Sequence, residues 1–294
     1  MQKKTFYRVM NMGLRLGLGI IASIAVAHSQ QYTPTTPTQN DLYCSGVITD
    51  QQIPHDSYVI SGENSSYKTT FFSGDYIFIN RGGSQGVKVG DEFDVVRPIY
   101  DGMASVVWFK YQAMLSKAMG TRYADIGRLR VIHVDEKTST TQEVIGCEPI
   151  QRNDTVLPFQ ARIAPQFHNI KLDPFAPPSG KKTAMIVNAK DYTTLSGPGR
   201  IVYVNLGSAQ GLRVGDYFRI FRYQNTRIES VAQHRNTAYK TYGFGSTPVA
   251  YEWNNLPRQV LGEGIVLRLG TNSSTVMLTD ARWEIFVGDY VEVE

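Results

Sequence analysis

The stretch YIFINRGGSQGVKVGDEFDVVR, residues 76–97, returns later in the chain as IVYVNLGSAQGLRVGDYFRIFR, residues 201–222. The two stretches align without a gap at an offset of 201 − 76 = 125. Average amino-acid usage gives roughly one or two identities by chance over such a length. The identical pairs are Asn80/Asn205, Gly82/Gly207, Gln85/Gln210, Gly86/Gly211, Val89/Val214, Gly90/Gly215, Asp91/Asp216, Phe93/Phe218 and Arg97/Arg222.

A second matching block follows in each half. IGRLRVIHV, residues 126–134, corresponds to LGEGIVLRL, residues 261–269, at an offset of 261 − 126 = 135. The second copy therefore carries 135 − 125 = 10 more residues between its blocks. The same offset pairs Asp154 with Asp289, so the order, spacing and ending of the two halves agree. An internal duplication follows.

Each copy reads as short strands joined by tight turns. Residues 77–79 and 202–204 are apolar strands that lead into Gly-rich turns, and the second block predicts another strand in each half. Helical spacing of Trp108, Tyr111, Leu115 and Met119 predicts a helix over residues 107–119, ended by Gly120. The predicted fold is all-β, with two related small β-barrel or sandwich domains in tandem and a short helix inserted in the first. The expected divisions are a signal peptide at 1–29, a Thr/Pro-rich linker at 30–40, a first β-domain at 41–157, a Pro-rich linker at 158–182 and a second β-domain at 183–294.

The N-terminus has the three parts of a secretory signal. Residues 1–15 carry four basic side chains, residues 16–27 are apolar and small, and small residues favour cleavage after Ser29. The apolar stretch is too short to span a bilayer, which needs ~20 apolar residues. Without residues 1–29 the chain has 30 − 4 = 26 basic and 26 acidic side chains. A neutral chain has no electrostatic footprint for nucleic acid, so we expect an exported protein, periplasmic or extracellular, with no nucleic-acid partner and no membrane span after cleavage.

The chain has two cysteines, Cys44 and Cys147. An even pair in an exported chain predicts one disulfide, which would tie the N-terminal segment to the end of the first domain. Two buried free thiols are the alternative.

The repeated turn motif invites a search for chemistry. Its residues are Gly86, Gly90 and Asp91 in the first copy and Gly211, Gly215 and Asp216 in the second. The glycines lack the Lys-Ser/Thr ending of a phosphate loop, and a Gly-Asp context is typical of a turn in which the carboxylate accepts nearby amides. No two histidines lie at metal-ligand spacing. The expectation is a protein with no catalytic residues, metal or cofactor.

The longer connection in the second copy, residues 223–258, is polar and aromatic. Four of its aromatic residues are candidates to face a ligand, because inserts on β scaffolds commonly bind. They are Tyr239, Tyr242, Tyr251 and Trp253. The alternative is that these rings cap the barrel, as buried aromatics commonly anchor loops.

The pattern of apolar strand, Gly, Gln-Gly-Val/Leu, Lys/Arg and Val-Gly-Asp resembles the C-terminal domain of flagellar assembly protein T. Residues 76–157 and 201–293 carry it, through Gly86, Val89, Gly90 and Asp91 and their counterparts Gly211, Val214, Gly215 and Asp216. The first copy ends in Asn153-Asp154 where the pattern has Gly-Asp. The resemblance implies a small β-barrel from a periplasmic protein that helps build a ring around the flagellar motor. The chain also resembles uncharacterised exported bacterial proteins with the same double pattern.

These features predict a non-enzymatic cell-envelope protein that serves as an assembly or scaffold component. Its expected partners are envelope proteins or further copies of itself. The alternative is a module that binds peptidoglycan or another glycan through the aromatic insert at 223–258.

Overall fold

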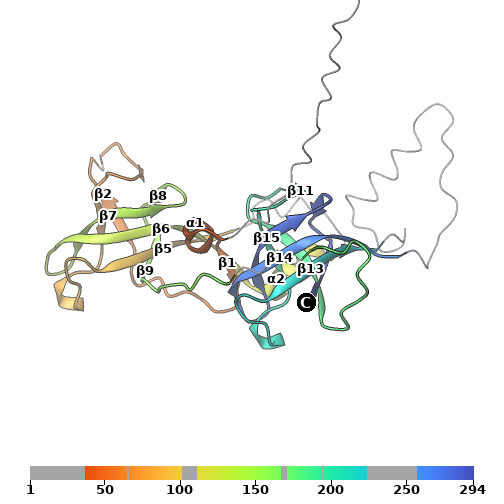
Figure 1. Ribbon diagram of the computed structural model, residues 1–294. Coiled ribbons are helices and arrows are strands. Elements are labelled where there is room, and N and C mark those ends of the chain that lie inside the picture. Colours follow the sequence, from red (N-terminus) through yellow and green to blue (C-terminus); the bar gives the residue numbers. More distant parts are fainter. Residues whose placement is uncertain (1–36, 65, 101–110, 167–170, 194, 224–256) are drawn as a thin grey trace, which may run out of the picture. The chain divides into compact units, whose positions relative to one another are not determined.

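The computed structural model describes residues 37–64, 66–100, 111–166, 171–193, 195–223 and 257–294, and Pro34–Glu294 form one compact unit. The fold is all-β, as the sequence predicts (Figure 1). Its N-terminal elements are a short helix, α1 (Gln39–Tyr43), and a short strand, β1 (Val47–Thr49). Among the described residues, no helix combines the length and the apolar character that a membrane span requires. The proposed signal, residues 1–29, lies outside the described residues.

The second copy is a closed six-stranded barrel. Its strands follow the order β10-β12-β15-β14-β13-β17, and every neighbouring pair, including β17 with β10, is antiparallel. Closure leaves no free sheet edge, which is the usual solution for a small antiparallel domain. The strands are β10 (Thr183–Ala189), β12 (Ile201–Val204), β13 (Tyr217–Arg222), β14 (Gln259–Leu269), β15 (Ser274–Ala281) and β17 (Tyr290–Val293).

The first copy follows the same path. Its strands run in the order β2-β4-β7-β6-β5-β9, with β1 added beside β6. An isolated bridge between Tyr58 and Thr155 brings the two ends of this sheet together, and the amide of Val59 donates to the carbonyl of Asp154. The sheet therefore curls round on itself, and we call it the first barrel, although regular strand pairing closes only the second. The strands are β2 (Val59–Gly62), β4 (Ile77–Ile79), β5 (Glu92–Ile99), β6 (Thr121–Val134), β7 (Ser139–Gly146) and β9 (Thr155–Pro158).

Smaller elements are duplicated as well. A two-stranded pair, β3 (Thr70–Phe71) with β8 (Ile150–Gln151), corresponds to β11 (Leu195–Ser196) with β16 (Ile285–Phe286). A 3-10 turn follows β4 and β12, namely η1 (Gly83–Gln85) and η2 (Ser208–Gln210). The duplication therefore extends to strands that the sequence alignment did not reach, such as β2 and β10.

Each barrel has its own apolar interior. Residues that alternate along the strands point inward, so the first barrel buries Ile77, Ile79 and Val131 and the second buries Val202, Val204 and Val266 at the corresponding places. The identical pair Phe93 and Phe218 belongs to these interiors. Burying a large aliphatic or aromatic side chain contributes ~1.5–3 kcal/mol, so these interiors hold each barrel together.

The helix of the first copy is α2 (Gln112–Met119), which ends at Gly120 as predicted. Residues 107–110 of the expected helix lie outside the described residues. The expected linker at 30–40 needs a correction, because α1 begins at Gln39. Its N-cap Thr38 and Asp41 form a capping box, which satisfies free amides at the start of the helix. Pro158, the first residue of the expected second linker, belongs to β9.

Gly82 and Gly207 are required by a close approach of two backbone segments. A Cβ at Gly82 would lie 2.5 Å from the amide of Thr138, and one at Gly207 would lie 2.5 Å from the amide of Ser273. Both glycines thus allow the 3-10 turn to pack against the hairpin between β6 and β7, or between β14 and β15.

We expect Gly82→Ala to lower the free energy of unfolding by ~1–3 kcal/mol, because backbone atoms cannot move away from the new methyl group. The neighbouring Gly83→Ala is the matched control, since its Cβ would meet nothing nearer than 3.6 Å. Denaturant unfolding of both variants checks the expectation. Equal losses would show that the close approach is not what selects glycine.

Candidate functional site

The repeated Asp91 and Asp216 close a tight turn in each barrel. The carboxylate of Asp91 accepts the amide of Lys88 at 2.9 Å, and that of Asp216 accepts the amide of Arg213 at 2.7 Å. The preceding Gly90 and Gly215 have φ of 96° and 93°, a conformation that glycine adopts at no steric cost. Gly86 and Gly211, with φ of 82° and 89°, end the 3-10 turns in the same left-handed region.

An ion pair between arginine and aspartate is also repeated, and in each barrel it joins two neighbouring strands near their ends. Arg97 makes two hydrogen bonds to the carboxylate of Asp154, at 2.6 and 2.7 Å, and Arg222 makes two to Asp289, at 2.8 and 2.7 Å. Asn153 has φ of 71°, so it takes the left-handed conformation that Gly288 takes in the second copy. Asparagine is among the residues that tolerate this region best, which explains why the first copy can end in Asn-Asp.

The polar residues of the repeated motif are therefore used in building the barrel. Asn80 accepts the amide of Tyr58, just before β2, and Asn205 accepts the amide of Met185 in β10. Gln85 and Gln210 each accept the amide of the glycine before the 3-10 turn. Val89 and Val214 are the identical apolar side chains that stay exposed, at 66% and 47%, whereas Phe93 and Phe218 are buried. A site specific to this protein has to be sought where the two copies differ.

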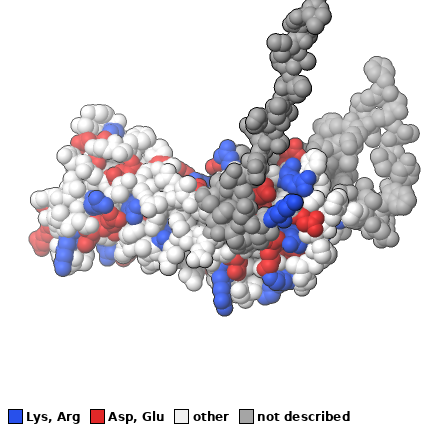
Figure 2. Space-filling model, in the orientation of Figure 1, with Lys and Arg blue, Asp and Glu red and all other residues white. Residues whose placement is uncertain are grey.

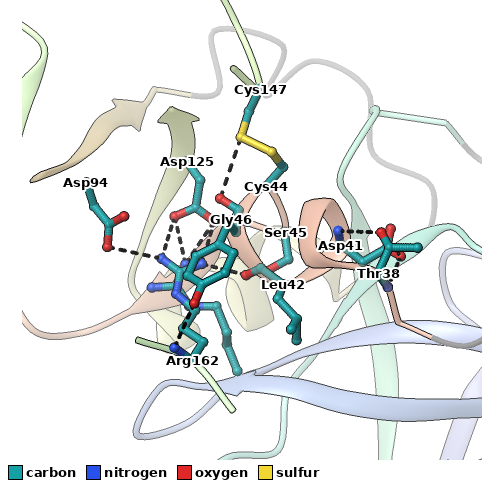
Figure 3. The surroundings of a disulfide bond; sticks show 12 residues. Thr38, Asp41, Leu42, Cys44, Ser45, Gly46, Asp94, Asp125, Cys147 and Arg162 are labelled. Atoms are coloured by element: carbon teal, nitrogen blue, oxygen red, sulfur yellow. Dashed lines mark hydrogen bonds and ion pairs between the residues drawn. A yellow bond between two sulfur atoms is a disulfide. The ribbon is translucent and has the colours of Figure 1, made fainter. Parts of the chain in front are cut away.

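The N-terminal residues 38–50 form a strap whose strand β1 pairs with β6, whereas among the described residues the corresponding strand β14 pairs only with β13 and β15. The predicted disulfide is confirmed: Cys44 and Cys147 are bonded, with their Cα atoms 5.4 Å apart, and this bond fixes the strap to the end of β7 (Figure 3). The closed loop spans 103 residues of sequence. A disulfide across such a long loop reduces the conformational entropy of the unfolded chain. In the chain-entropy model this raises the free energy of unfolding by several kcal/mol.

The strap bonds to both barrels. On one side, β1 pairs with β6 of the first barrel, with Val47 opposite Tyr123. On the other side, three hydroxyl groups of the second barrel donate to strap carbonyls, which satisfies polar groups that burial would otherwise leave unpaired. These bonds are Tyr203 Oη to Ser45 O at 3.0 Å, Thr275 Oγ1 to Gly46 O at 3.0 Å, and Ser273 Oγ to Ile48 O.

An apolar face on the outside of the second barrel lies under the strap and under α2. We define this covered face as Val187, Ile201, Tyr203, Tyr217, Ile265, Leu267 and Met277, all buried. Leu42 and Ile48 of the strap and Met119 of α2 pack against it. Because the covered face and the interior alternate along the strands, β12 is buried at every position.

Helix α2 adds polar contacts at the edge of the covered face. The side-chain amide of Gln112 donates to the carbonyl of Val187 at 2.9 Å, and Asn188 donates to Ser116 Oγ at 3.0 Å. The helix belongs to the connection between β5 and β6 of the first barrel, yet it packs on β10 of the second.

Asp125 is a buried charge at this junction, and it faces cations from two other segments. Figure 3 shows one of them, Arg162, beside Asp125. Arg268 of β14 lies 2.9 Å from it, Arg162 of the connection between the barrels lies 3.1 Å from it, and the amide of Gly46 donates to it at 2.8 Å. Burial alone would raise the pKa of Asp125, but Arg268 and Arg162 outweigh it, and the pKa lies below its ordinary value. Arg162 also donates to the carbonyl of Leu42 at 2.6 Å.

Other features of the described residues give weaker indications of a functional site. A polar hollow of about 410 Å³ on the first barrel is lined by His55 and Arg97 among others, but His55 bonds to Thr155 and Asn153, and Arg97 to Asp154. In the described part of the chain, no group of three or more His, Cys, Asp or Glu side chains is placed to share a metal ion. Figure 2 shows acidic and basic side chains interspersed over the visible face, as expected for a chain with 30 basic and 26 acidic side chains.

The candidate aromatics Tyr239, Tyr242, Tyr251 and Trp253 lie outside the described residues, so their role stays a prediction. Sequence reasoning missed the strap, the covered face and the cluster around Asp125. One signal was available: residues 201–204, Ile-Val-Tyr-Val, have no polar residue, whereas a strand with one face in water alternates.

A scan against protein-family models finds no match to this chain, and a search of the curated proteins finds none either.

We expect Asp125→Asn to lower the free energy of unfolding by ~3–5 kcal/mol, because it removes the nearest anion from two partly buried guanidinium groups, of which Arg162 keeps only the more distant Asp94, at 3.8 Å. The control is Asp191→Asn, which breaks the exposed pair with Arg200 and should cost less than ~1 kcal/mol. Denaturant unfolding at neutral pH measures both. Since the folded pKa of Asp125 is lowered, the stabilisation should be present above pH ~4 and fade as the pH falls below that. A small effect of Asp125→Asn at neutral pH would contradict the assigned role.

Glu263 on β14 should make the free energy of unfolding depend on pH in the opposite direction to Asp125. Burial, with Glu294 and Asp280 nearby, raises the pKa of Glu263 to about 7. The folded chain then holds a proton that the unfolded chain has lost, so this residue makes the free energy of unfolding fall as the pH rises from ~4.3 to about 7. We expect Glu263→Gln to remove that fall and to stabilise the protein at neutral pH and above. Unfolding measured across this range, beside the exposed control Glu284→Gln, checks it, and parallel curves for Glu263→Gln and the parent would contradict it.

Proposed function

We propose that this chain is an exported, non-enzymatic component of a bacterial cell envelope, and that its tandem barrels act as a scaffold for protein assembly. Two features support export. The N-terminal sequence has the parts of a secretory signal, and the Cys44–Cys147 disulfide suits an oxidising compartment. The location is periplasmic or at the cell surface.

The observation that carries the scaffold proposal is the junction between the barrels. The repeated residues build the barrels, while residues that differ between the copies build the contacts between the two barrels: the strap, α2 and the cluster around Asp125. A covered apolar face with a hydrogen-bonded rim has the composition of a permanent protein interface. The residues that distinguish the two copies thus join one β-barrel to another. Joining protein domains is also what an assembly component does.

The resemblance to the C-terminal domain of flagellar assembly protein T belongs to the same proposal. That resemblance implies a small β-barrel, and the barrel formed by β10 to β17 agrees with it in architecture. The most specific version of this proposal is that the chain takes part in building a ring around the flagellar motor. The glycan-binding alternative depends on the aromatic residues within 224–256, which lie outside the described residues.

Crosslinking in the intact source cell tests the proposal. After crosslinking, the envelope is fractionated and the partners of the chain are identified by mass spectrometry. We expect discrete crosslinks to envelope proteins or to further copies of the chain. The same crosslinks should be lost in an Asp125→Asn strain, in which the junction is weakened, and kept in the Asp191→Asn control. Recovery of the chain with the cell-wall sacculus and without protein partners would contradict the proposal and favour glycan binding.

A further inference from the structure

The polar hollow on the first barrel lies at a corner that both barrels share. Two of the residues that line it are Arg97 and Asp154, the ion pair that corresponds to Arg222 and Asp289 in the second barrel. The neighbouring strands also correspond, because β8 leads into β9 in the first copy as β16 leads into β17 in the second. The contents of this corner can therefore be compared directly between the two copies.

In the second barrel, packed aromatic rings lie beside the ion pair. Tyr223 and Tyr290 pack edge to face with their ring centroids 5.1 Å apart, and Phe221 lies 5.3 Å from Tyr223 in the same geometry. The guanidinium of Arg222 lies 5.0 Å from the centroid of the Phe286 ring. Aromatic pairs at such distances attract each other beyond the effect of the area that they bury. A barrel of this kind can thus close the corner with apolar packing alone.

In the first barrel, three of these rings are replaced by smaller or polar residues. All three replacements line the hollow, so the hollow lies where the second barrel has rings. Its volume is about 410 Å³. Pockets for small molecules commonly measure ~300–1,000 Å³. The pairs of corresponding residues are Pro98/Tyr223, Gln151/Phe286 and Thr155/Tyr290.

Contacts within the first barrel hold the lining side chains in place. His55 bonds to Thr155 at 2.7 Å and to Asn153 at 3.2 Å, and its ring stacks on that of Tyr58 with the centroids 5.6 Å apart. These contacts order the walls of the hollow before a ligand arrives, which reduces the conformational entropy lost on binding.

The formal charges around the hollow nearly cancel. The lining cations Arg97 and Arg152 stand against one lining anion, Asp154, and Glu148 lies 3.9 Å from Arg97. Sites for phosphate and similar anions instead aim guanidinium groups at the ligand, free of competing carboxylates. The balance of charge therefore favours a neutral ligand.

The remaining polar groups both donate and accept hydrogen bonds. Gln52, Gln151 and Asn153 line the hollow, and each side-chain amide has two N–H donors and an acceptor oxygen. A hydroxyl group also donates and accepts, so a ligand with many hydroxyl groups matches this lining. Tyr100 lines the hollow as well and is 83% exposed, which leaves its ring able to pack on the apolar C–H face of a sugar.

We propose that the hollow of the first barrel binds a neutral saccharide. The amide side chains and the Arg97–Asp154 pair bind its hydroxyl groups, and Tyr100 packs against its ring. This inference goes beyond the proposed assembly function and does not rest on it. A saccharide bound here ties the first barrel to a glycan through described residues, at a different place from the insert at 223–258.

Saturation-transfer difference NMR on the full chain with its disulfide intact tests the proposal. The probes are N-acetylglucosamine, chitobiose, cellobiose and maltose. We expect the parent to bind at least one of them. The double variant Gln151→Phe with Thr155→Tyr should bind it at least ~tenfold more weakly, because rings like those of the second barrel then occupy the hollow.

The matched control makes the same two changes on β7, as Gln142→Phe with Thr140→Tyr. These residues are not among the described residues that line the hollow, so the control should bind like the parent. Thermal unfolding checks that both double variants are folded. A parent that binds none of the saccharides, or equal binding by the two double variants, would overturn the proposal.

A single exposed ring gives a second test that does not depend on how the double variant folds. Tyr100→Ala should raise the dissociation constant at least ~threefold, because the stacking surface is lost. Tyr67→Ala is the control, since Tyr67 is 78% exposed and lies between β2 and β3, outside the described lining of the hollow. Equal binding by these two variants, or full displacement of the saccharide by acetate, would contradict a site for a neutral saccharide.

Discussion

A carboxylate can remain ionised inside a protein when cations and amides replace the water it loses, and Asp125 is held in this way. Its partners come from three parts of the chain other than β6, which carries it: the strap supplies the amide of Gly46, the connection between the barrels supplies Arg162, and β14 supplies Arg268. None of these parts can move away without leaving a buried charge unpaired, which costs several kcal/mol. The arrangement of the strap, the connection and both barrels therefore depends on this one cluster.

The apolar contacts and the disulfide act together with the cluster. Leu42, Ile48 and Met119 exclude water from the covered face, and a dry surrounding strengthens the ion pairs beside it. The Cys44–Cys147 bond keeps the strap close to the first barrel, so the strap lies ready to contact the second. The duplication gives two similar barrels whose outer faces differ. The apolar outer face of the second barrel is the one that the strap and α2 of the first copy cover.

Much of the barrel could be predicted from the sequence, because its signals are local. Glycine before aspartate in both copies indicates the turn that the structure shows at Asp91 and Asp216, and alternation indicates the strands. The disulfide could be predicted from two cysteines in a chain whose N-terminal sequence predicts export. The junction could not, because Asp125, Arg162 and Arg268 lie far apart in sequence and have no shared pattern. The sequence predicts a linker up to Asn40, because Thr and Pro dominate the residues before it, whereas the capping box that starts α1 depends on Asp41.

Calorimetric unfolding of the full chain with its disulfide intact tests the central claim, that the covered face and the Asp125 cluster join the two barrels into one cooperative structure. The account predicts a single transition whose calorimetric and van't Hoff enthalpies agree, since neither barrel can unfold without exposing the junction. Two separate transitions, each with the enthalpy of one barrel, would show that the barrels unfold independently and would contradict the account.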